Sequence, residues 1–329
     1  MRVRIMLALL VFAFASGCGS SSTPPAAITV APADQKPPGA QDVTAMPDPT
    51  VTVTPDPGAA SCTDPELSLR PGALPEPGAM PTGSTMAAIA GRGRLIVGVD
   101  QDSYPFGSRN PTTGQLEGFD IDVARELARA LLGDPDLVDL KVINPTQRET
   151  ELQSGGVDLV VRTYSINCKR EESVAFSTTY FYAHQKILVV KGSGIHSVAD
   201  LPGKRVCSVF GTTSLARLFT LDPRPTLVGV SSWTDCLVML QQGQVDAIST
   251  DDAVLAGLVH QDPNVETVGD SMGIEPYGVG VKRGSDDLVR FVNGVLERMR
   301  VDGTWERLYD ARLRGLGPSP GPPQPKYRD

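Results

Sequence analysis

The sequence of 329 residues is short of the groups that several large classes of function require. Positive charge is scarce, because 30 Lys and Arg residues against 38 Asp and Glu residues give a formal net charge of −8. This balance argues against nucleic acid and against an electrostatically held membrane surface, since both need basic patches. Three histidines without clustered Cys/His spacing indicate neither a metal site nor a cofactor. A Walker-type glycine loop and a nucleophile elbow are also missing, so no common enzyme signature is present.

Aromatic residues are few as well, at 5%, but hydrophobic residues make up 40% of the chain, which is enough for one large or two modest domains. A short phrase occurs twice: LQSGGVD at residues 152–158 is echoed by LQQGQVD at residues 240–246. Each copy leads into an apolar run that has the composition of a buried strand. The repeat predicts two similar lobes.

Residues 1–17 have the pattern of a signal peptide, with arginines first, an apolar run over 5–15 and small residues before Cys18. The apolar run is too short to span a membrane. Small residues directly before a cysteine and a Ser-rich stretch after it resemble a bacterial lipobox, although Ala15 stands where leucine is usual. The alternative is an ordinary signal peptide with an incidental cysteine. We therefore expect an extracytoplasmic protein that is anchored to the cell membrane by lipid on Cys18.

Residues 18–85 are rich in Pro, Ala, Thr, Ser, Gly and Asp and show no apolar periodicity, which predicts an extended tether that cannot fold by itself. Residues 317–329 form a Pro-rich tail.

The four remaining cysteines are an even number in an exported chain, which favours disulfides over the alternative of free buried thiols. Three pairings are possible. Cys207 and Cys236 both fall in the second lobe, whereas Cys168 falls in the first, and this predicts a Cys207–Cys236 disulfide. It leaves Cys62 for Cys168, a pair that would staple the far end of the tether to the folded body.

Strands and helices alternate through the folded part, which predicts an α/β fold with largely parallel sheets. Strands are expected at 94–100, 137–143, 157–161, 186–190, 204–209, 226–230, 245–250 and 279–282. Parallel strands deliver ligand-binding groups at their carboxyl ends. Thr163, Ser165 and Arg170 follow one such strand, and Asp251 and Asp252 follow another. One lobe thus offers a cation and the other an anion, which a zwitterion could bridge.

Several motifs in residues 86–316 occur in the order found in a known family. They are Gly118–Ala124, Leu152–Asp158, Asn167–Arg170 with Phe176 and Ser177, Gly211–Ser214, Tyr277 with Gly278, Asn293 with Gly294, and Asp302–Thr304. With these motifs the folded part resembles the polar amino-acid solute-binding proteins of ABC importers (solute-binding protein family 3), specifically glutamine- and glutamate-binding lipoproteins of actinobacterial type.

The resemblance implies the two-lobed type II periplasmic-binding-protein fold, with the ligand in the cleft between the lobes. The hinge would have two crossings, near His184 and Gln185 and near Pro276 and Tyr277. Lobe 1 would comprise residues 86–184 and 278–316, and lobe 2 residues 185–277.

The same resemblance implies roles for single residues. Arg170 would bind the ligand α-carboxylate in a bidentate pair, helped by Thr163 and Ser165. Without the resemblance, Arg170 has the pattern of a solvated charge. Asp251 would take the ligand ammonium, while Asp252 would be the N-cap of the next helix.

Two further elements have a ligand-binding and a purely structural alternative. Gly211–Ser214, with Thr212 and Thr213, would place backbone amides at a helix N-terminus that suits a carboxylate or an amide oxygen, or would simply start a helix. Phe106 would form the apolar floor of the cleft, or belong to the core.

Arg162 stands where many family members carry a small residue, and it bears on ligand choice. If its side chain points into the cleft, it would bind a side-chain carboxylate, and the ligand would be glutamate or aspartate first. If it pairs with Asp100 instead, the pocket stays neutral and glutamine or asparagine could bind as well.

The resemblance implies a monomeric receptor, not an enzyme, that binds a free amino acid and presents it to membrane permease subunits of an ABC importer. An alternative is an amino-acid sensor that docks on a membrane signalling protein. A third possibility, a dehydratase on the same fold, would need a cleft acid that has no ligand-charge role, and the sequence offers no compelling one.

Overall fold

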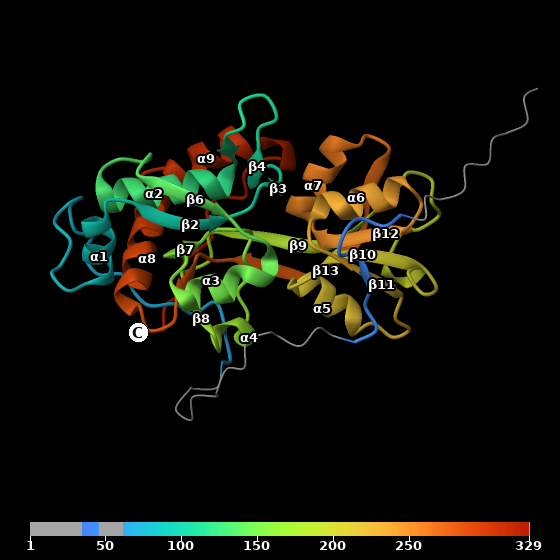
Figure 1. Cartoon of the computed structure of the whole chain (residues 1–329), viewed down its shortest axis with the longest axis horizontal. Helices are drawn as coiled ribbons and strands as arrows, with labels where there is room; N and C mark the ends of the chain where they lie inside the picture. Colours follow the sequence, from blue (N-terminus) through green and yellow to red (C-terminus); the bar gives the residue numbers. More distant parts are fainter. Residues whose placement is uncertain (1–34, 46–61, 329) are drawn as a thin grey trace, which may run out of the picture. The chain divides into compact units, whose positions relative to one another are not determined.

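The computed structural model describes residues 35–45 and 62–328. The expected signal peptide and Cys18 lie outside the described residues. Two α/β lobes are visible in Figure 1. None of the helices in the described ranges has both the length and the apolar character needed to cross a membrane.

Lobe 1 is built on a five-stranded sheet with the order β6-β2-β7-β14-β8. Its strands are β2 (Leu95–Val99), β6 (Val138–Val142), β7 (Leu159–Val160), β8 (Val174–Phe176) and β14 (Gly280–Lys282). Its helices are α1 (Thr85–Arg92), α2 (Phe119–Leu132), α3 (Arg148–Ser154), α4 (Cys168–Glu171), α8 (Asp286–Val301) and α9 (Thr304–Arg312). A small sheet joins β3 (Asp102–Ser103), β4 (Gly107–Arg109) and β5 (Leu116–Glu117).

Lobe 2 is built on a six-stranded sheet with the order β1-β11-β10-β12-β9-β13. Its strands are β1 (Gln41–Asp42), β9 (Phe181–Val190), β10 (Arg205–Val209), β11 (Thr226–Val230), β12 (Ala247–Asp251) and β13 (Val265–Tyr277). Its helices are α5 (Thr213–Phe219), α6 (Trp233–Gln241) and α7 (Asp252–Gln261).

Strand direction is mixed in both sheets, which corrects the expectation of largely parallel ones. In lobe 1, β2 is parallel to β6 and β7, and in lobe 2, β10 is parallel to β11 and β12. The remaining pairs, made by β1, β9, β13 and β14, are antiparallel. The reason is connectivity: β9 leaves lobe 1 and the chain returns along β13 into β14, so these strands run against their neighbours.

The two lobes are joined by β9 and β13, which pair along most of their length (Figure 1). His184 lies opposite Ile274, and Tyr182 lies opposite Pro276. The residues expected at the hinge therefore lie on two paired strands. Gln185 is fully buried there, and its side-chain amide donates to the carbonyl oxygen of Ser214 at 3.1 Å.

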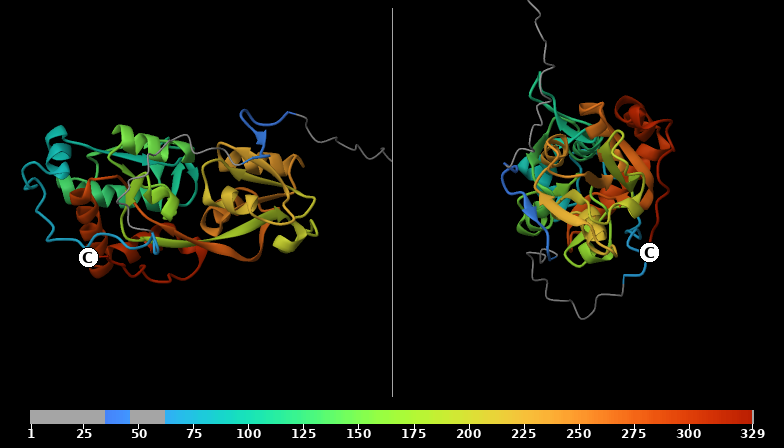
Figure 2. Two further views of the ribbon diagram at one scale, coloured as in Figure 1. Left: turned by 90° about the horizontal axis from the view of Figure 1, so that it is seen from below. Right: turned by 90° about the vertical axis from the view of Figure 1, so that its right-hand side faces the viewer.

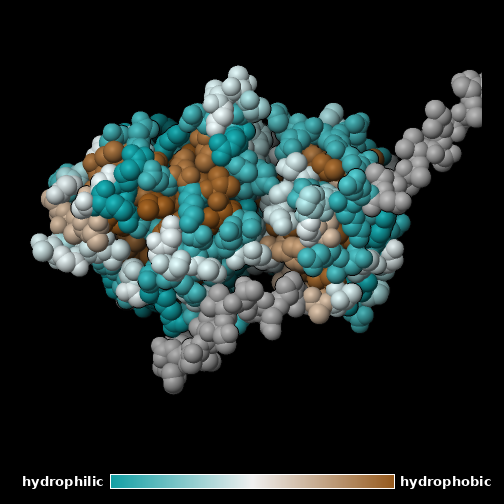
Figure 3. All heavy atoms as spheres, viewed as in Figure 1, coloured by the Kyte–Doolittle hydropathy of each residue, from teal (hydrophilic) through white to brown (hydrophobic). Residues whose placement is uncertain are grey.

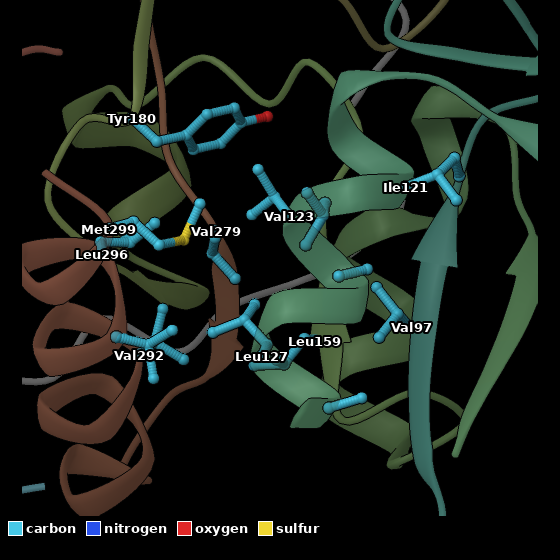
Figure 4. Packing of buried hydrophobic residues seen from close by; sticks show 14 of the residues in the cluster. Val97, Ile121, Val123, Leu127, Leu159, Tyr180, Val279, Val292, Leu296 and Met299 are labelled. Carbon is cyan, nitrogen blue, oxygen red and sulfur yellow. The ribbon is translucent and has the colours of Figure 1, made fainter. Parts of the chain in front are cut away.

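The core of lobe 1 forms where α2 and α8 turn apolar faces toward the sheet. Val123 and Leu127 of α2 face Val292 and Leu296 of α8 (Figure 4). Each of these side chains is almost completely buried, which stabilises the fold by about 1.5–3 kcal/mol per large aliphatic group. Gly118, before α2, has φ +134° and lies where a Cβ would come within 2.2 Å of the Phe106 carbonyl oxygen, so only glycine fits.

Both predicted disulfides are confirmed. Cys207 in β10 bonds to Cys236 in α6 with a Cα–Cα distance of 5.6 Å, and Cys62 bonds to Cys168 in α4 with a Cα–Cα distance of 5.5 Å. Both distances lie in the ordinary range for a disulfide.

The prediction of an unfolded tether over residues 18–85 is wrong for two described segments. Gln41 and Asp42 form β1, which adds to the edge of the lobe 2 sheet, and Val43 is buried beside it. Residues 62–74 pack on lobe 1, where the Ser68 hydroxyl donates to the Phe176 carbonyl oxygen at 2.7 Å. Backbone pairing with a sheet edge and single buried side chains are contacts that composition does not reveal.

The C-terminal tail lies beside residues 62–74 on lobe 1 (Figure 2). Ser68 and Tyr327 form a parallel bridge, and Arg300 Nε donates to the Pro323 carbonyl oxygen at 2.8 Å. The face shown in Figure 3 is mostly hydrophilic, with smaller hydrophobic areas.

Candidate ligand-binding site

A cleft between the lobes gathers most of the residues that the sequence predicted for ligand binding. Lobe 1 contributes Arg148, Arg162, Thr163, Ser165 and Arg170, and lobe 2 contributes Thr212, Thr213, Ser214, Trp233, Thr250, Asp251 and Val254. Five of these were not predicted as site residues: Arg148, Ser214, Trp233, Thr250 and Val254.

The turn after β7 carries Thr163 in a left-handed conformation, with φ +40°, which a β-branched residue rarely adopts. The Thr163 amide donates to Asp120 Oδ2 at 2.8 Å, and the Tyr180 hydroxyl donates to Asp120 Oδ1 at 2.7 Å. Burial raises the pKa of Asp120 to about 6. Asp120 belongs to the Gly118–Ala124 motif, so this motif shapes the turn that presents Thr163 and Ser165 to the cleft.

Arg170 lies in the short helix α4, with its side chain buried. Nη1 donates to the Ser165 carbonyl oxygen at 2.5 Å, and Nη2 donates to the Gly211 carbonyl oxygen of lobe 2 at 3.1 Å. The neighbouring Lys169 side chain, by contrast, is 69% exposed and pairs with Glu172. The alternative of a solvated charge therefore applies to Lys169 and not to Arg170.

Arg148 is a second buried guanidinium in the same wall. Nη2 donates to the Gly211 carbonyl oxygen at 2.8 Å, Nε donates to the Pro145 carbonyl oxygen at 3.0 Å, and the guanidinium lies over the Tyr164 ring. None of the ion pairs found among the described residues involves Arg148. Burial, and next the charge of Arg170, lower the pKa of Arg148 to about 9.

Arg162 pairs with Asp100, which is the second of the two alternatives considered for it. Its Nη2 pairs with Asp100 Oδ2 at 2.9 Å, with both side chains buried, and its Nε donates to the Ile143 carbonyl oxygen at 2.7 Å. Burial alone would raise the pKa of Asp100, but Arg162 keeps it below its ordinary value. Arg162 lines the cleft, but this pair with Asp100 is the one that the second alternative describes, and it offsets the charge of Arg162 within lobe 1.

Two other candidates lie behind the cleft wall. Asp100 serves Arg162 and is not among the lining residues. Phe106 is fully buried in the lobe 1 core, with its ring edge-on to those of Phe181 and Tyr277. The structural alternative for Phe106 thus describes it better than the cleft floor does.

Asp251 ends β12 in the opposite wall and is buried. Its Oδ2 accepts a hydrogen bond from the Tyr277 hydroxyl at 2.5 Å, and its Oδ1 accepts one from the Ser214 hydroxyl at 3.3 Å. Burial, and next the charge of Glu275, raise the pKa of Asp251 to about 7. A cation that bound here would favour the ionised form.

The predicted N-cap role of Asp252 is wrong by one position. Asp251 is the N-cap residue of α7, and Asp252 is its first helical residue. The Asp252 carboxylate accepts hydrogen bonds from the amides of Ala253 at 2.8 Å and of His184 at 3.0 Å. Asp252 therefore ties α7 to the crossing strand β9 and leaves the cleft to Asp251.

The start of α5 completes the lobe 2 wall. Thr212 is its N-cap, and the Thr212 hydroxyl oxygen accepts from the Leu215 amide at 3.2 Å. The Thr213 hydroxyl donates to Glu275 Oε2 at 2.6 Å, and Glu275 in turn pairs with Arg217 at 2.7 Å. Amides in the first turn of a helix have no acceptor within the helix, so those of Thr213 and Ser214 can serve a ligand oxygen.

Gly211, directly before this helix start, is where the two walls touch. Its carbonyl oxygen accepts from both Arg148 and Arg170, as described above. Gly211 has φ +74°, and a Cβ there would lie 3.0 Å from Thr146 and 3.1 Å from Pro145 of lobe 1. The conformation and the close approach both require glycine.

The described part of the chain contains no group of three or more His, Cys, Asp and Glu side chains that could hold a metal ion. The lining groups are instead three guanidinium groups in the lobe 1 wall, the Asp251 carboxylate in the lobe 2 wall, and hydroxyl groups from both lobes.

Comparison with known proteins agrees with this arrangement. Residues 95–313 match the bacterial extracellular solute-binding proteins, family 3. The chain is 36% identical over 226 residues to the ABC transporter glutamine-binding protein GlnH of Bacillus subtilis, covering 68% of this chain and 83% of that protein. It is 34% identical over 240 residues to the glutamate-binding protein GluB of Corynebacterium glutamicum, covering 69% of this chain and 81% of that protein.

A crystal structure of the solute receptor for L-cysteine of Neisseria gonorrhoeae is similar as well, with a TM-score of 0.69 and 29% identity over 72% of this chain and 98% of that one. The two lobes, their mixed sheets and the two joining strands are those of the type II periplasmic-binding-protein fold. The chain belongs to the bacterial extracellular solute-binding proteins, family 3.

Proposed function

We propose that this protein is an extracytoplasmic receptor that closes on one polar amino acid and delivers it to the permease subunits of an ABC importer. The observation that carries the proposal is that one wall of the cleft contains a buried arginine, Arg170, and the opposite wall contains a buried carboxylate, Asp251. A free amino acid carries the complementary charges on two groups that are bonded to the same carbon.

The α-carboxylate would bind to Arg170. The guanidinium donates to the neutral carbonyl oxygens of Ser165 and Gly211, and its Nε lies 3.8 Å from Glu149 Oε1. A carboxylate is a stronger acceptor, because hydrogen bonds between ionised partners are about twice as strong as neutral ones. The hydroxyls of Thr163 and Ser165 and the first amides of α5 would serve its remaining lone pairs.

The ammonium group would bind to Asp251. An ionised carboxylate offers about four acceptor positions, and the hydroxyls of Tyr277 and Ser214 use two of them. The others are free to accept N–H groups from a ligand. The charge of the ammonium would also offset the repulsion that Asp251 receives from Glu275.

The ligand side chain is proposed to be acidic, and the residue that supports this proposal is Arg148 in place of Arg162. Arg148 is a buried guanidinium whose hydrogen bonds go to carbonyl oxygens and which forms no ion pair within the described ranges. A second carboxylate on the ligand would supply the missing counter-charge, whereas an amide would not. We therefore place glutamate and aspartate ahead of glutamine and asparagine, by about 1–2 kcal/mol or roughly 5- to 30-fold in affinity.

Lipid on Cys18 is proposed as the membrane anchor, from the lipobox-like sequence that precedes it. Metabolic labelling of cells with a radioactive fatty acid tests this part. Labelled protein is expected from the natural sequence and none from Cys18→Ala, and equal labelling of both would contradict it.

Calorimetry with all twenty amino acids on the protein purified without its first 18 residues tests the receptor itself. Binding of at least one polar amino acid is expected, and no binding at millimolar concentrations would contradict the proposed function.

The ligand class is tested with Arg148→Gln, which should weaken the binding of glutamate and aspartate more than the binding of glutamine and asparagine. Arg129→Gln, an exposed arginine on α2, is the matched control. Tighter binding of the amides by the natural sequence would contradict the acidic preference alone.

A further inference from the structure

Residues 62–74, here called the flanking segment, precede the family match at 95–313 and yet are attached firmly to lobe 1. The attachments are a disulfide from Cys62, a carboxylate from Glu66 and a hydroxyl from Ser68. The contacts of the flanking segment are therefore additional to those made within the part of the chain that matches the family.

The disulfide reaches the element that carries the proposed ligand arginine. Cys168 is the first residue of α4, and Arg170 follows it by two positions in the same helix. The helix has four residues, a single turn. Helices this short are not stable by themselves, so the position of α4 depends on what holds it from outside.

Glu66, in the middle part of the flanking segment, is bonded to lobe 1, to a crossing strand and to the C-terminal tail. Glu66 Oε2 accepts hydrogen bonds from the hydroxyls of Thr179, at 3.1 Å, and Tyr182. Tyr182 lies on β9 opposite Pro276 of β13. Glu66 Oε1 accepts from Lys326 Nζ of the C-terminal tail at 2.9 Å.

Ser68 and its neighbour add anchors on lobe 1 itself. The side-chain amide of Asn293 in α8 donates to the Ser68 hydroxyl oxygen at 2.8 Å and to the Leu69 carbonyl oxygen at 2.7 Å. Asn293 is fully buried, and its Oδ1 accepts from the Thr178 amide at 2.7 Å. The flanking segment is thus a fixed point to which the Cys62–Cys168 disulfide ties α4.

We propose that the Cys62–Cys168 disulfide and the flanking segment position Arg170 for the ligand carboxylate. The two cysteines do not contact the ligand and act only through α4, which they hold against lobe 1. The proposal rests on the proposed function of Arg170. A bidentate pair between a guanidinium and a carboxylate depends on both distance and plane, so a helix free to shift weakens it without unfolding the lobe.

The test compares two variants that each lose one disulfide. Cys62→Ser with Cys168→Ser removes the tie on α4, and Cys207→Ser with Cys236→Ser removes a buried disulfide in lobe 2 that does not contact Arg170. Dissociation constants and dissociation rates are measured with L-glutamate, beside the thermal midpoint without ligand. The first variant should bind about 5- to 20-fold more weakly and release ligand faster, a loss well below that of removing the arginine itself. The second should keep its affinity.

Selective reduction gives the same comparison without mutation. Cys62 is exposed whereas Cys207 and Cys236 are buried, so dithiothreitol should reduce the first disulfide first. The reagent gives two electrons and two protons to the two sulfurs and becomes a cyclic disulfide. Affinity should fall on reduction and return on reoxidation, in the natural sequence and not in the variant that lacks Cys62 and Cys168.

Three results are informative in different ways. Equal affinity before and after reduction of Cys62–Cys168, verified by peptide mass, would overturn the positioning role. An equal loss of affinity in the two double variants would also overturn it, since a general loss of stability would then explain both. If the natural sequence binds no amino acid at all, the proposed function fails and the positioning role fails with it.

Discussion

The two walls of the cleft carry opposite charges, and these buried charges have different hydrogen-bond partners in the two walls. Lobe 1 presents Arg148 and Arg170, whose guanidinium groups reach across the cleft to the same Gly211 carbonyl oxygen. Lobe 2 presents Asp251, whose hydrogen bonds come from Ser214 and from Tyr277 at the end of a crossing strand. Of these three charged groups, the two cations contact the opposite wall directly, whereas Asp251 bonds to Ser214 of its own lobe and to Tyr277 of a crossing strand.

Each wall contains one buried group whose pKa is shifted against its charged form. Burial and a neighbouring charge of the same sign lower the pKa of Arg148 to about 9, and they raise the pKa of Asp251 to about 7. A zwitterion placed between the walls offsets both effects at once, whereas an uncharged solute would offset neither. This comparison explains why ligand binding and closure should be coupled, because a ligand that contacts both walls favours the state in which they are close.

The largest effect is expected from removing the cation of lobe 1. Arg170→Ala should weaken amino-acid binding by about 2–5 kcal/mol, or roughly thirtyfold to several thousandfold, because the ligand carboxylate would enter the closed cleft without its partner. Calorimetry measures this, and circular dichroism checks that the variant is folded. Lys169→Ala, one position earlier and exposed, is the control and should bind normally. Near-normal affinity of the Arg170 variant would place the carboxylate elsewhere.

Removing the anion of lobe 2 should have a smaller effect. Asp251→Asn keeps the shape and one acceptor but loses the charge, which should weaken binding by roughly 100-fold, within the range for one partner of a buried ion pair. Closure should also be reduced, because the ligand would then be held strongly by one wall only. Small-angle scattering with saturating ligand measures it, with Asp252→Asn as the neighbouring control. Full compaction of the Asp251 variant would count against the bridging model.

The contact between the walls is tested at Gly211. Gly211→Ala adds a Cβ 3.0 Å from Thr146 and 3.1 Å from Pro145 of lobe 1, closer than ordinary van der Waals contact, in a backbone conformation with positive φ. Overpacking of this kind costs about 1–3 kcal/mol. The share of this cost that exists only in the closed state, where the walls touch, opposes closure and should weaken binding by roughly 5- to 30-fold. Gly243→Ala, also at positive φ but with no neighbour within 4 Å of the added Cβ, is the control for backbone strain. Equal affinities of the two variants would show that the walls need not touch at Gly211.

Much of this architecture could be read from the sequence because it depends on local periodicity and on strand ends. The strand before Asp251 and the turn holding Thr163 and Ser165 were both placed correctly, since an apolar run followed by polar residues marks the carboxyl end of a strand. The repeated phrase correctly indicated two lobes. The error over Asp252 arose because β12 extends through Asp251, which made Asp251 the N-cap.

The errors and omissions concern contacts that depend on which elements become neighbours. Arg162 pairs with Asp100 because β2 and β7 lie side by side in the sheet, and the order of strands was not known from the sequence. Arg148 was not predicted as a site residue, and only the structure shows that this residue of α3 is buried and lines the cleft. The flanking segment has a composition typical of disorder, and its attachment depends on a disulfide and on hydrogen bonds to distant residues.

The smallest effect, and the most specific, is the pH dependence of binding. Burial and Glu275 raise the pKa of Asp251 to about 7 in the ligand-free protein, so the carboxyl is largely protonated below that pH. A protonated Asp251 must lose its proton before it can pair with the ligand ammonium. Affinity should therefore be nearly constant from pH 8 to pH 9 and fall toward about tenfold per pH unit below pH 7, which makes binding at pH 6 roughly tenfold weaker.

Calorimetry at pH 6 in buffers of different ionisation enthalpy should show one proton released per ligand bound, and none at pH 8. Three other carboxyls in the described part of the chain have raised pKa values: Asp102 at about 8, Asp120 at about 6, and Glu171, whose pKa is raised by burial. The assignment therefore needs a variant. Asp251→Asn should bind weakly but with an affinity that stays flat between pH 6 and pH 8. If that variant keeps the full pH dependence, the titrating group is not Asp251, and the anionic side of the comparison between the two walls would have to be assigned to another carboxylate.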